Sequence, residues 1–216
     1  MSQAVPASVS TADQEPDPGA LHTAHARTTF VAGRLMLAAN TTLQSSFLFA
    51  YLYLRANNFG GMWRPAGVNP PATSINTLAL MIPVLGVVAL ALAVRAAATG
   101  ERRPVTRALG IALVVALATI AMRIYQLYQS GWNLTCPTTV CMTPPPTGAY
   151  VDVSILWFVV LLAEFVVGAL WMLSLYMGHV RRTVAATKAQ VQSLYEYWAF
   201  VTGVALFVYI LVQFVN

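Results

Sequence analysis

Five long apolar runs constrain what this chain can fold into more than any other feature. They extend over Phe30–Leu54, Ile75–Val94, Ala108–Tyr128, Val153–Met177 and Tyr197–Val215. Each is close to the roughly 20 residues that a helix needs to cross a membrane, and none alternates like a barrel strand. Hydrophobic residues make up 58% of the chain and charged residues only 9%, against about 25% charged in soluble domains. We therefore predict an all-α integral membrane protein, a bundle of five transmembrane helices.

The basic residues are distributed unevenly between the two predicted sides of the membrane. The formal net charge is +5, but these side chains lie beside the apolar runs, where they set orientation, so nucleic-acid binding is not predicted. One side carries Arg27, Arg34, Arg95, Arg102, Arg103, Arg107, Arg181, Arg182 and Lys188, and the other carries Arg55 and Arg64. Because basic segments stay inside, we expect the N-terminus inside and the C-terminus outside.

The first 28 residues differ in composition from the rest. They carry three acidic residues among Pro, Ser, Thr and Ala, without the basic start and apolar core of a signal peptide. Such a segment buries too little apolar surface to offset its ordering entropy. We expect a mobile cytoplasmic tail over residues 1–28 and a five-helix membrane domain over 29–216. His22 and His25 are spaced for a shared metal on a helix, but a solvated pair is the favoured interpretation.

The two cysteines, Cys136 and Cys141, lie in "CPTTVC" within the predicted outer loop. A disulfide is the leading interpretation, because thiols outside the membrane are usually paired. Copper ligation together with Met142 and a pair of free thiols are the two alternatives.

Metal-binding side chains are missing from all five apolar runs. The three histidines are His22, His25 and His179, each in the tail or a loop, so no histidine or cysteine can hold a haem inside a span. The sequence also contains no phosphate-binding loop, nucleophile elbow or carboxylate pair at catalytic spacing. We expect no catalytic residue, cofactor or metal in this chain and assign any chemistry to a partner.

A few polar residues inside the runs invite a reason, because a charge at the bilayer centre costs about 2.5–3.5 kcal/mol on insertion scales. Glu164 lies near the middle of its run, where it can relay protons or, as we favour, hydrogen-bond a neighbouring helix. Arg123 is close to an outer end, and we expect it to snorkel outward as an interfacial anchor. Arg34 and Glu196 lie at similar depth near the inner surface, where they either pair or snorkel.

Small residues recur at helical spacing in the first and last runs. Ala38, Thr42, Ser46 and Ala50 form one stripe, and Ala199 with Gly203 form another. Such stripes allow close helix contact, and the amide of Asn40 can bond across the same interface. Tyr195, Tyr197 and Trp198 are expected to form an aromatic belt at headgroup level, with Glu196 facing the inner water layer.

The order of several motifs resembles subunit III of the haem-copper (cytochrome c) oxidases, in the short bacterial form with five helices. The segments are "FLFAYLYLR", "GGMWRPAGVNPP", "SINTLAL", "IYQLYQSG", "GAYVDVSILWF", "VVGALWMLSLY" and "YWAFVTGVALFVYI", which cover nearly everything after residue 28. The chain departs from the family at its polar landmarks. Asn40 and Gln126 stand where glutamates are usual, Leu161 and Glu164 replace a His-x-x-His pair, and Ala199 and Thr202 replace a histidine and an aspartate.

This resemblance implies a divergent, non-catalytic subunit III of a bacterial terminal oxidase in the inner membrane. It would dock on the catalytic subunit I, which holds haem and copper, and contact the other oxidase subunits. Bound phospholipid, stabilisation of the catalytic subunit and protection of proton uptake are further expectations. An accessory chain of a nitric oxide reductase, and a stand-alone transporter or channel that uses Glu164 and Arg123, are the alternatives.

Overall fold

The fold is entirely helical in the part of the chain that the structure, a computed structural model, describes. That part comprises residues 18–58, 63–64, 72–129, 149–181 and 187–214, without the side chains of 18–27 and 29. The helices are α1 (Pro18–Ala56), α2 (Thr73–Thr99), α3 (Arg102–Gln129), α4 (Ala149–Val180) and α5 (Lys188–Phe214). The described residues of each predicted apolar run fall on one of them, which confirms the all-α prediction. The predicted disulfide Cys136–Cys141 lies outside these residues.

Four of these helices, α2 to α5, are long and apolar enough to cross a membrane. α1 is long, but its apolar run is diluted by Arg34 and by the polar residues between Asn40 and Ser46. A multi-pass membrane protein is therefore supported, and a crossing by α1 stays a prediction. α1 begins at Pro18, so residues 18–28, which were predicted to belong to a mobile tail, are helical.

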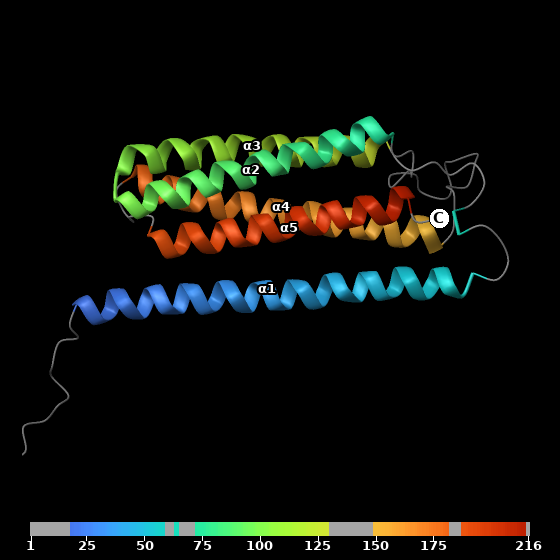
Figure 1. Cartoon of the computed structure of the whole chain (residues 1–216), viewed down its shortest axis with the longest axis horizontal. Coiled ribbons are helices and arrows are strands. Elements are labelled where there is room, and N and C mark those ends of the chain that lie inside the picture. The colour runs from blue at the N-terminus through green and yellow to red at the C-terminus, as the bar shows by residue number, and fades with distance from the viewer. Residues whose placement is uncertain (1–17, 59–62, 65–71, 130–148, 182–186, 215–216) are drawn as a thin grey trace, which may run out of the picture.

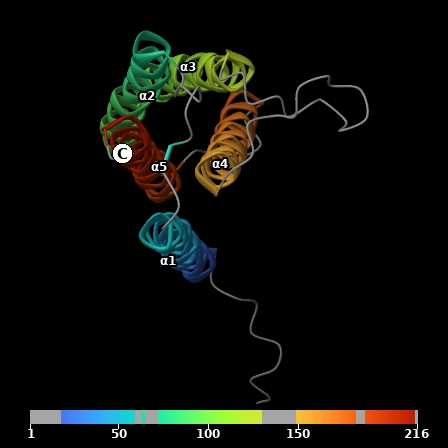
Figure 2. The ribbon, with the colours of Figure 1, turned by 90° about the vertical axis from the view of Figure 1, so that its right-hand side faces the viewer.

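α1 is set apart from the other four helices (Figures 1 and 2). Seen end on, α2, α3, α4 and α5 form one bundle, and α1 lies against the side of it that α4 and α5 provide. Within the described residues α1 contacts only α4 and α5, whereas α2 packs on α3 and α5, and α3 packs on α4. The fold is thus a four-helix bundle with an additional helix on one face.

Helices α2 and α3 are joined by one of the shortest connections in the molecule. Gly100 follows α2 in the left-handed conformation, with φ of 72°, which glycine adopts without a Cβ penalty. α3 starts two residues later at Arg102, so the two helices run antiparallel along their length.

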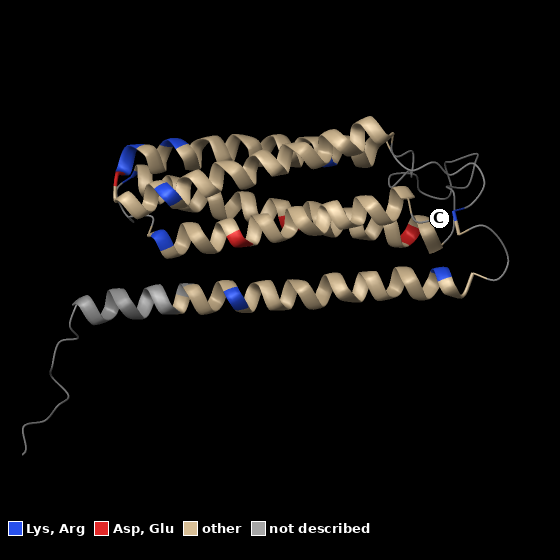
Figure 3. Cartoon of the chain, in the orientation of Figure 1, with Lys and Arg blue, Asp and Glu red and all other residues tan. Residues whose placement is uncertain are grey.

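Basic residues gather at one end of the bundle (Figure 3), which we call the Arg-rich end. The described members are Arg95, Arg102, Arg103, Arg107, Arg181 and Lys188, and Arg55 and Arg64 lie at the opposite end. The guanidinium of Arg102 donates to the main-chain oxygen of His179, which ties the start of α3 to the end of α4. The predicted inside orientation of the Arg-rich end remains a prediction.

The core is centred on Trp198, whose side chain is fully buried. Its indole N–H donates to the Pro83 carbonyl of α2 at 3.0 Å. A Cβ added to Gly86 on α2 would meet the indole at 2.5 Å, and one added to Gly168 on α4 would meet it at 3.0 Å. Tyr197 is also buried and donates to the main chain of α4. The predicted aromatic belt is therefore wrong for both residues, because glycines on two other helices leave space for rings inside the bundle.

Candidate functional site

The first buried polar group lies where α1 meets α4, and we call Asn40, Gln44, Trp157 and Glu164 the Glu164 cluster. The Gln44 amide nitrogen donates to Glu164 Oε1 at 2.6 Å. The indole N–H of Trp157 donates to Gln44 Oε1, also at 2.6 Å. Gln44 and Glu164 are both buried, and the Asn40 side chain lies in interaction range of the same carboxyl. Glu164 thus joins α4 to α1 by a side-chain hydrogen bond.

Two oxygens of the Glu164 cluster are buried without a hydrogen-bond partner in the described part of the chain. They are Asn40 Oδ1 and Glu164 Oε2. An ionised carboxylate only accepts hydrogen bonds, so it cannot satisfy the amide oxygen, whereas a protonated carboxyl is also a donor. The chemistry open to this cluster is therefore the holding of one proton on Glu164 and its release.

An aromatic series flanks the Glu164 cluster. Trp157 packs against Phe47 with ring centroids 6.1 Å apart and against Tyr51 at 6.3 Å. Tyr51 meets Trp63 edge-on at 5.3 Å, and Trp63 meets Tyr150 in the same way at 5.9 Å. Pairs of this kind contribute about 0.5–1.5 kcal/mol beyond the area that they bury. They add aromatic contacts between α1 and α4 to the hydrogen bond of the Glu164 cluster.

The second polar group, the Arg123 cluster, joins α3, α2 and α5. Its members are the buried Arg123, Gln126 and Asn76, the partly buried Gln213 and the exposed Thr73. Arg123 Nη1 donates to Gln126 Oε1 at 2.8 Å, and the Gln126 amide nitrogen donates to Asn76 Oδ1. The Asn76 amide nitrogen donates to Gln213 Oε1 at 3.1 Å, and the Gln213 amide nitrogen donates to the Thr73 hydroxyl at 3.0 Å. Each side chain in this series donates a hydrogen bond to the next, starting from the Arg123 guanidinium.

Arg123 does not snorkel outward, and that prediction is wrong. Its side chain is only 4% exposed, and its guanidinium carbon lies 5.5 Å from the centre of the Phe165 ring. Among the residues described, neither Nε nor Nη2 of Arg123 finds a hydrogen-bond acceptor. The Gln126 bond and the Phe165 ring retain the guanidinium inside the bundle, where it is a fixed positive charge.

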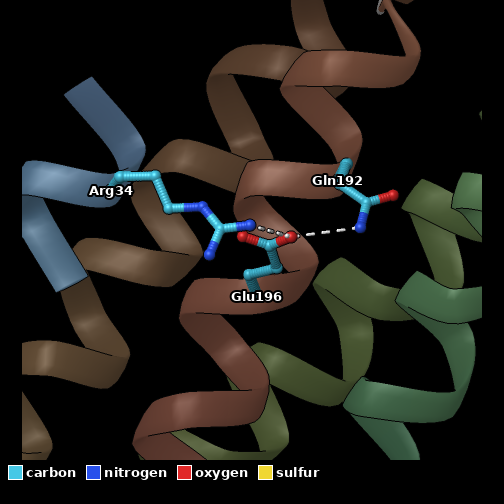
Figure 4. Close-up of polar contacts among 3 residues, drawn as sticks. All are labelled: Arg34, Gln192 and Glu196. Carbon is cyan, nitrogen blue, oxygen red and sulfur yellow. Dashed lines mark hydrogen bonds and ion pairs between the residues drawn. The ribbon is translucent and has the colours of Figure 1, made fainter. Parts of the chain in front are cut away.

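Arg34 and Glu196 form an ion pair between α1 and α5 (Figure 4). Arg34 Nη2 lies 3.3 Å from Glu196 Oε1, and the amide of Gln192 donates to the same oxygen at 3.1 Å. The Arg34 guanidinium also lies 5.0 Å from the centre of the Phe30 ring. The two charged side chains are 57% and 23% exposed. Of the two open interpretations, pairing is the one observed.

A groove of about 380 Å³ lies between α1 and α5, with Gln44 and Trp157 of the Glu164 cluster in its wall. Gly203 lines it as well, and a Cβ added there would meet nothing within 4 Å. Ala199, one turn earlier, is partly buried. Within the described residues, Gly203 therefore does not make the close helix contact that was expected of it.

The residues predicted from the sequence are thus divided among three places. Glu164 and Asn40 meet in one cluster, Arg123 and Gln126 in a second, and Arg34 with Glu196 form the surface pair. The sequence did not single out Gln44, Trp157, Asn76 or Gln213, although the glutamines and the asparagine are polar residues within helices, which the membrane interior disfavours. A polar residue inside an apolar helix was thus the sequence signal by which these three residues could have been found.

Within the described residues no group of three or more His, Cys, Asp or Glu side chains is placed to hold a metal ion. Comparisons of the sequence with models of known protein families and with curated proteins find no match.

Proposed function

We propose that this chain is a non-catalytic subunit of a bacterial respiratory complex, similar to subunit III of the haem-copper oxidases. Its role is to dock on a haem- and copper-bearing catalytic subunit and stabilise it during turnover. The observation that carries the proposal is α1, which packs on the bundle with one face and leaves the opposite face without contact in the described chain.

The outward face of α1 has the composition of a helix-docking surface. Val31, Leu35, Ala38, Thr42 and Ser46 are all exposed along it. The Thr42 and Ser46 hydroxyls donate to main-chain oxygens one turn earlier, at 3.1 and 2.9 Å, so they need no lipid or water partner. Small residues with satisfied hydroxyls permit close backbone approach, which drives helix association in lipid. A transmembrane helix of the catalytic subunit fits this face.

The groove between α1 and α5 is the proposed place for bound phospholipid. Its volume of about 380 Å³ suits an acyl chain, and Phe200, Val204 and Phe207 supply apolar walls. A lipid chain there would fill the space beside Gly203 and complete the packing of α1. The haem and copper of the complex belong, in this proposal, to the partner, as does the oxidation of cytochrome c or quinol.

The test is purification of the complex through a tag on this chain. We expect a partner whose optical spectrum shows haem and whose metal content includes copper. A partner with non-haem iron in place of copper would instead support a nitric oxide reductase. Deletion of this chain should leave the haems in place and shorten the period of sustained turnover. Unchanged turnover and inactivation rate after deletion would contradict the stabilising role.

The docking face can be tested directly with Ser46→Trp, which places a large ring on the outward side of α1. We expect loss of the partner from the purified complex without loss of the folded chain. Val114→Trp is the matched control, because Val114 is exposed on α3, which does not contact α1 within the described residues. Retention of the partner by Ser46→Trp would place the docking surface elsewhere.

A stand-alone transporter is the rival function of a different class. The two buried charges, Glu164 and Arg123, belong to separate clusters with different partner helices, and no hydrogen bond or ion pair between described residues joins them. Ion flux through the purified chain in liposomes, abolished by Glu164→Gln, would support this rival and contradict an accessory role.

A further inference from the structure

The charge of Arg123 is balanced by no carboxylate in the described part of the chain. The sequence has seven acidic residues. Glu101 and Glu196 lie toward the Arg-rich end, Asp152 is exposed on α4, and Glu164 bonds to α1. The segments that follow α1 and α3, residues 57–72 and 130–148, contain no acidic residue. Arg123 is therefore a buried charge without a carboxylate partner among the described residues.

The hydrogen bonds of Arg123 also leave capacity for a ligand. A guanidinium has five N–H donors and stays charged at any physiological pH. The described contacts use Nη1 alone, and Nε and Nη2 are buried without an acceptor. Leaving such donors unsatisfied costs about 1–3 kcal/mol for a neutral group and more for a charged one.

A small cavity adjoins the guanidinium. It measures about 10 Å³ and is lined by Arg123, Gln126, Asn76, Phe158 and Tyr209, among others. A space of this size holds about one water-sized particle. Carboxylates, phosphate and sulfate are excluded by size, so the occupant is a single water or a monatomic anion. Because water brings no charge, the charge of Arg123 favours the anion.

We propose that the Arg123 cluster binds one halide ion, chloride in the cell, in this cavity. Arg123 supplies the charge and the Nε and Nη2 donors. Gln126 contributes a second amide hydrogen, since its bond to Asn76 uses only one of two. The site is reached from the end opposite the Arg-rich end, because Arg123 lies six residues before Gln129, the last residue of α3, or roughly 9 Å along the helix axis.

The first test measures the thermal unfolding midpoint of the full chain in lipid nanodiscs. Sodium chloride, sodium bromide and sodium gluconate are compared at equal ionic strength. We expect chloride and bromide to raise the midpoint to a saturating value and gluconate, which is too large for the cavity, to leave it unchanged, since a ligand that binds only the folded state stabilises it. An equal response to all three salts would refute a halide site.

The decisive variant is Gln126→Glu, which puts a carboxylate within hydrogen-bond distance of Arg123 Nη1. This internal counter-charge should raise the midpoint in gluconate and remove the response to chloride. Arg107→Met, an exposed position on the same helix, should keep the full response. A full chloride response in Gln126→Glu would mean that the ion binds elsewhere and would overturn the proposal.

The position of the ion is checked by bromide soaks of crystals of the chain. We expect an anomalous peak beside the Arg123 guanidinium in the wild-type protein and none in Gln126→Glu. Density without anomalous signal at that point would identify a water only and refute the site. All three measurements use the purified chain alone, so their outcome is independent of the proposed partner.

Discussion

Glu164 and Arg123 are both ionisable side chains buried in the bundle, and they differ in how the cost of burying a charge can be removed. Glu164 lies on α4 toward α1, and Arg123 lies on α3 over Phe165, the next residue of α4. Each is buried, and each retains side-chain atoms without a hydrogen-bond partner in the described chain. A glutamate can remove its charge by binding a proton, but an arginine cannot. The Glu164 cluster can therefore become neutral by binding a proton, whereas the Arg123 cluster, in our proposal, needs an anion to balance its charge.

The largest expected effect comes from breaking the Glu164 cluster at Trp157. Trp157→Ala removes a fully buried ring with its contacts to Phe47 and Tyr51 and its bond to Gln44. We expect the free energy of unfolding in micelles to fall by about 3–5 kcal/mol and α1 to exchange its amide hydrogens faster than the other helices. Trp157→Phe, which keeps a ring, should lose much less. Equal protection of α1 in wild type and Trp157→Ala would contradict the role of this contact.

A second change asks whether Arg123 depends on its amide partner. Gln126→Leu removes the acceptor of Arg123 Nη1 and the bond from Gln126 to Asn76 Oδ1, so we expect a loss of about 1–3 kcal/mol in the free energy of unfolding. Because Leu cannot donate to a halide, the chloride response should weaken as well. Leu127→Ala, at the neighbouring partly buried position, controls for a general loosening of α3. A stable variant with an unchanged chloride response would show that Gln126 does not support the cluster.

Substitutions of Glu164 test whether its carboxyl is neutral or ionised in the folded protein. Glu164→Gln keeps an acceptor for Gln44 and adds a donor for Asn40 Oδ1, so the free energy of unfolding should change by less than about 1 kcal/mol. Glu164→Leu removes the bond to Gln44 and should cost about 1–2 kcal/mol. Both are measured by denaturation in the same micelles. A large loss in Glu164→Gln would indicate that the carboxylate is charged and that this cluster resembles the Arg123 cluster after all.

The smallest effect is expected at the exposed ion pair, which serves as a reference for the two buried groups. Arg34→Ala removes a contact between side chains that are 57% and 23% exposed. Exposed pairs contribute about 0–1 kcal/mol, and salt screens them. The difference between Arg34→Ala and wild type should shrink further as salt concentration rises. A cost equal to that of Gln126→Leu would show that this pair is not a surface contact in the membrane-bound protein.

The helices could be predicted from the sequence because crossing a membrane requires long apolar runs, and this requirement acts on each segment separately. Their ends were less certain: α4 extends from Ala149 to Val180, beyond the predicted run at both ends, and α1 begins at Pro18. The Arg34–Glu196 pair was among the open alternatives because the depth of each residue follows from its place in a helix. The depth of a residue along the bundle axis can thus be predicted from the sequence alone.

The direction in which a side chain points around its helix could not be predicted from the sequence in the same way. Arg123 was expected to reach the interface, but Phe165 and Gln126 retain it in the bundle. Trp198 was expected at headgroup level, but Gly86 and Gly168 make room for it. In both cases the rings or glycines that decide the outcome, Phe165 for Arg123 and Gly86 with Gly168 for Trp198, lie on another helix, and no pattern within one segment specifies that neighbour.

The indole of Trp198 fits between glycines on α2 and α4 and bonds to the Pro83 carbonyl. Its consequence is a fixed axial alignment of three helices. Sliding α5 by a single turn, about 5.4 Å, would drive the ring into side chains larger than hydrogen on both neighbours. The ring therefore fixes the positions of α2, α4 and α5 relative to one another along the bundle axis. The outward surfaces of these helices are consequently held at defined depths.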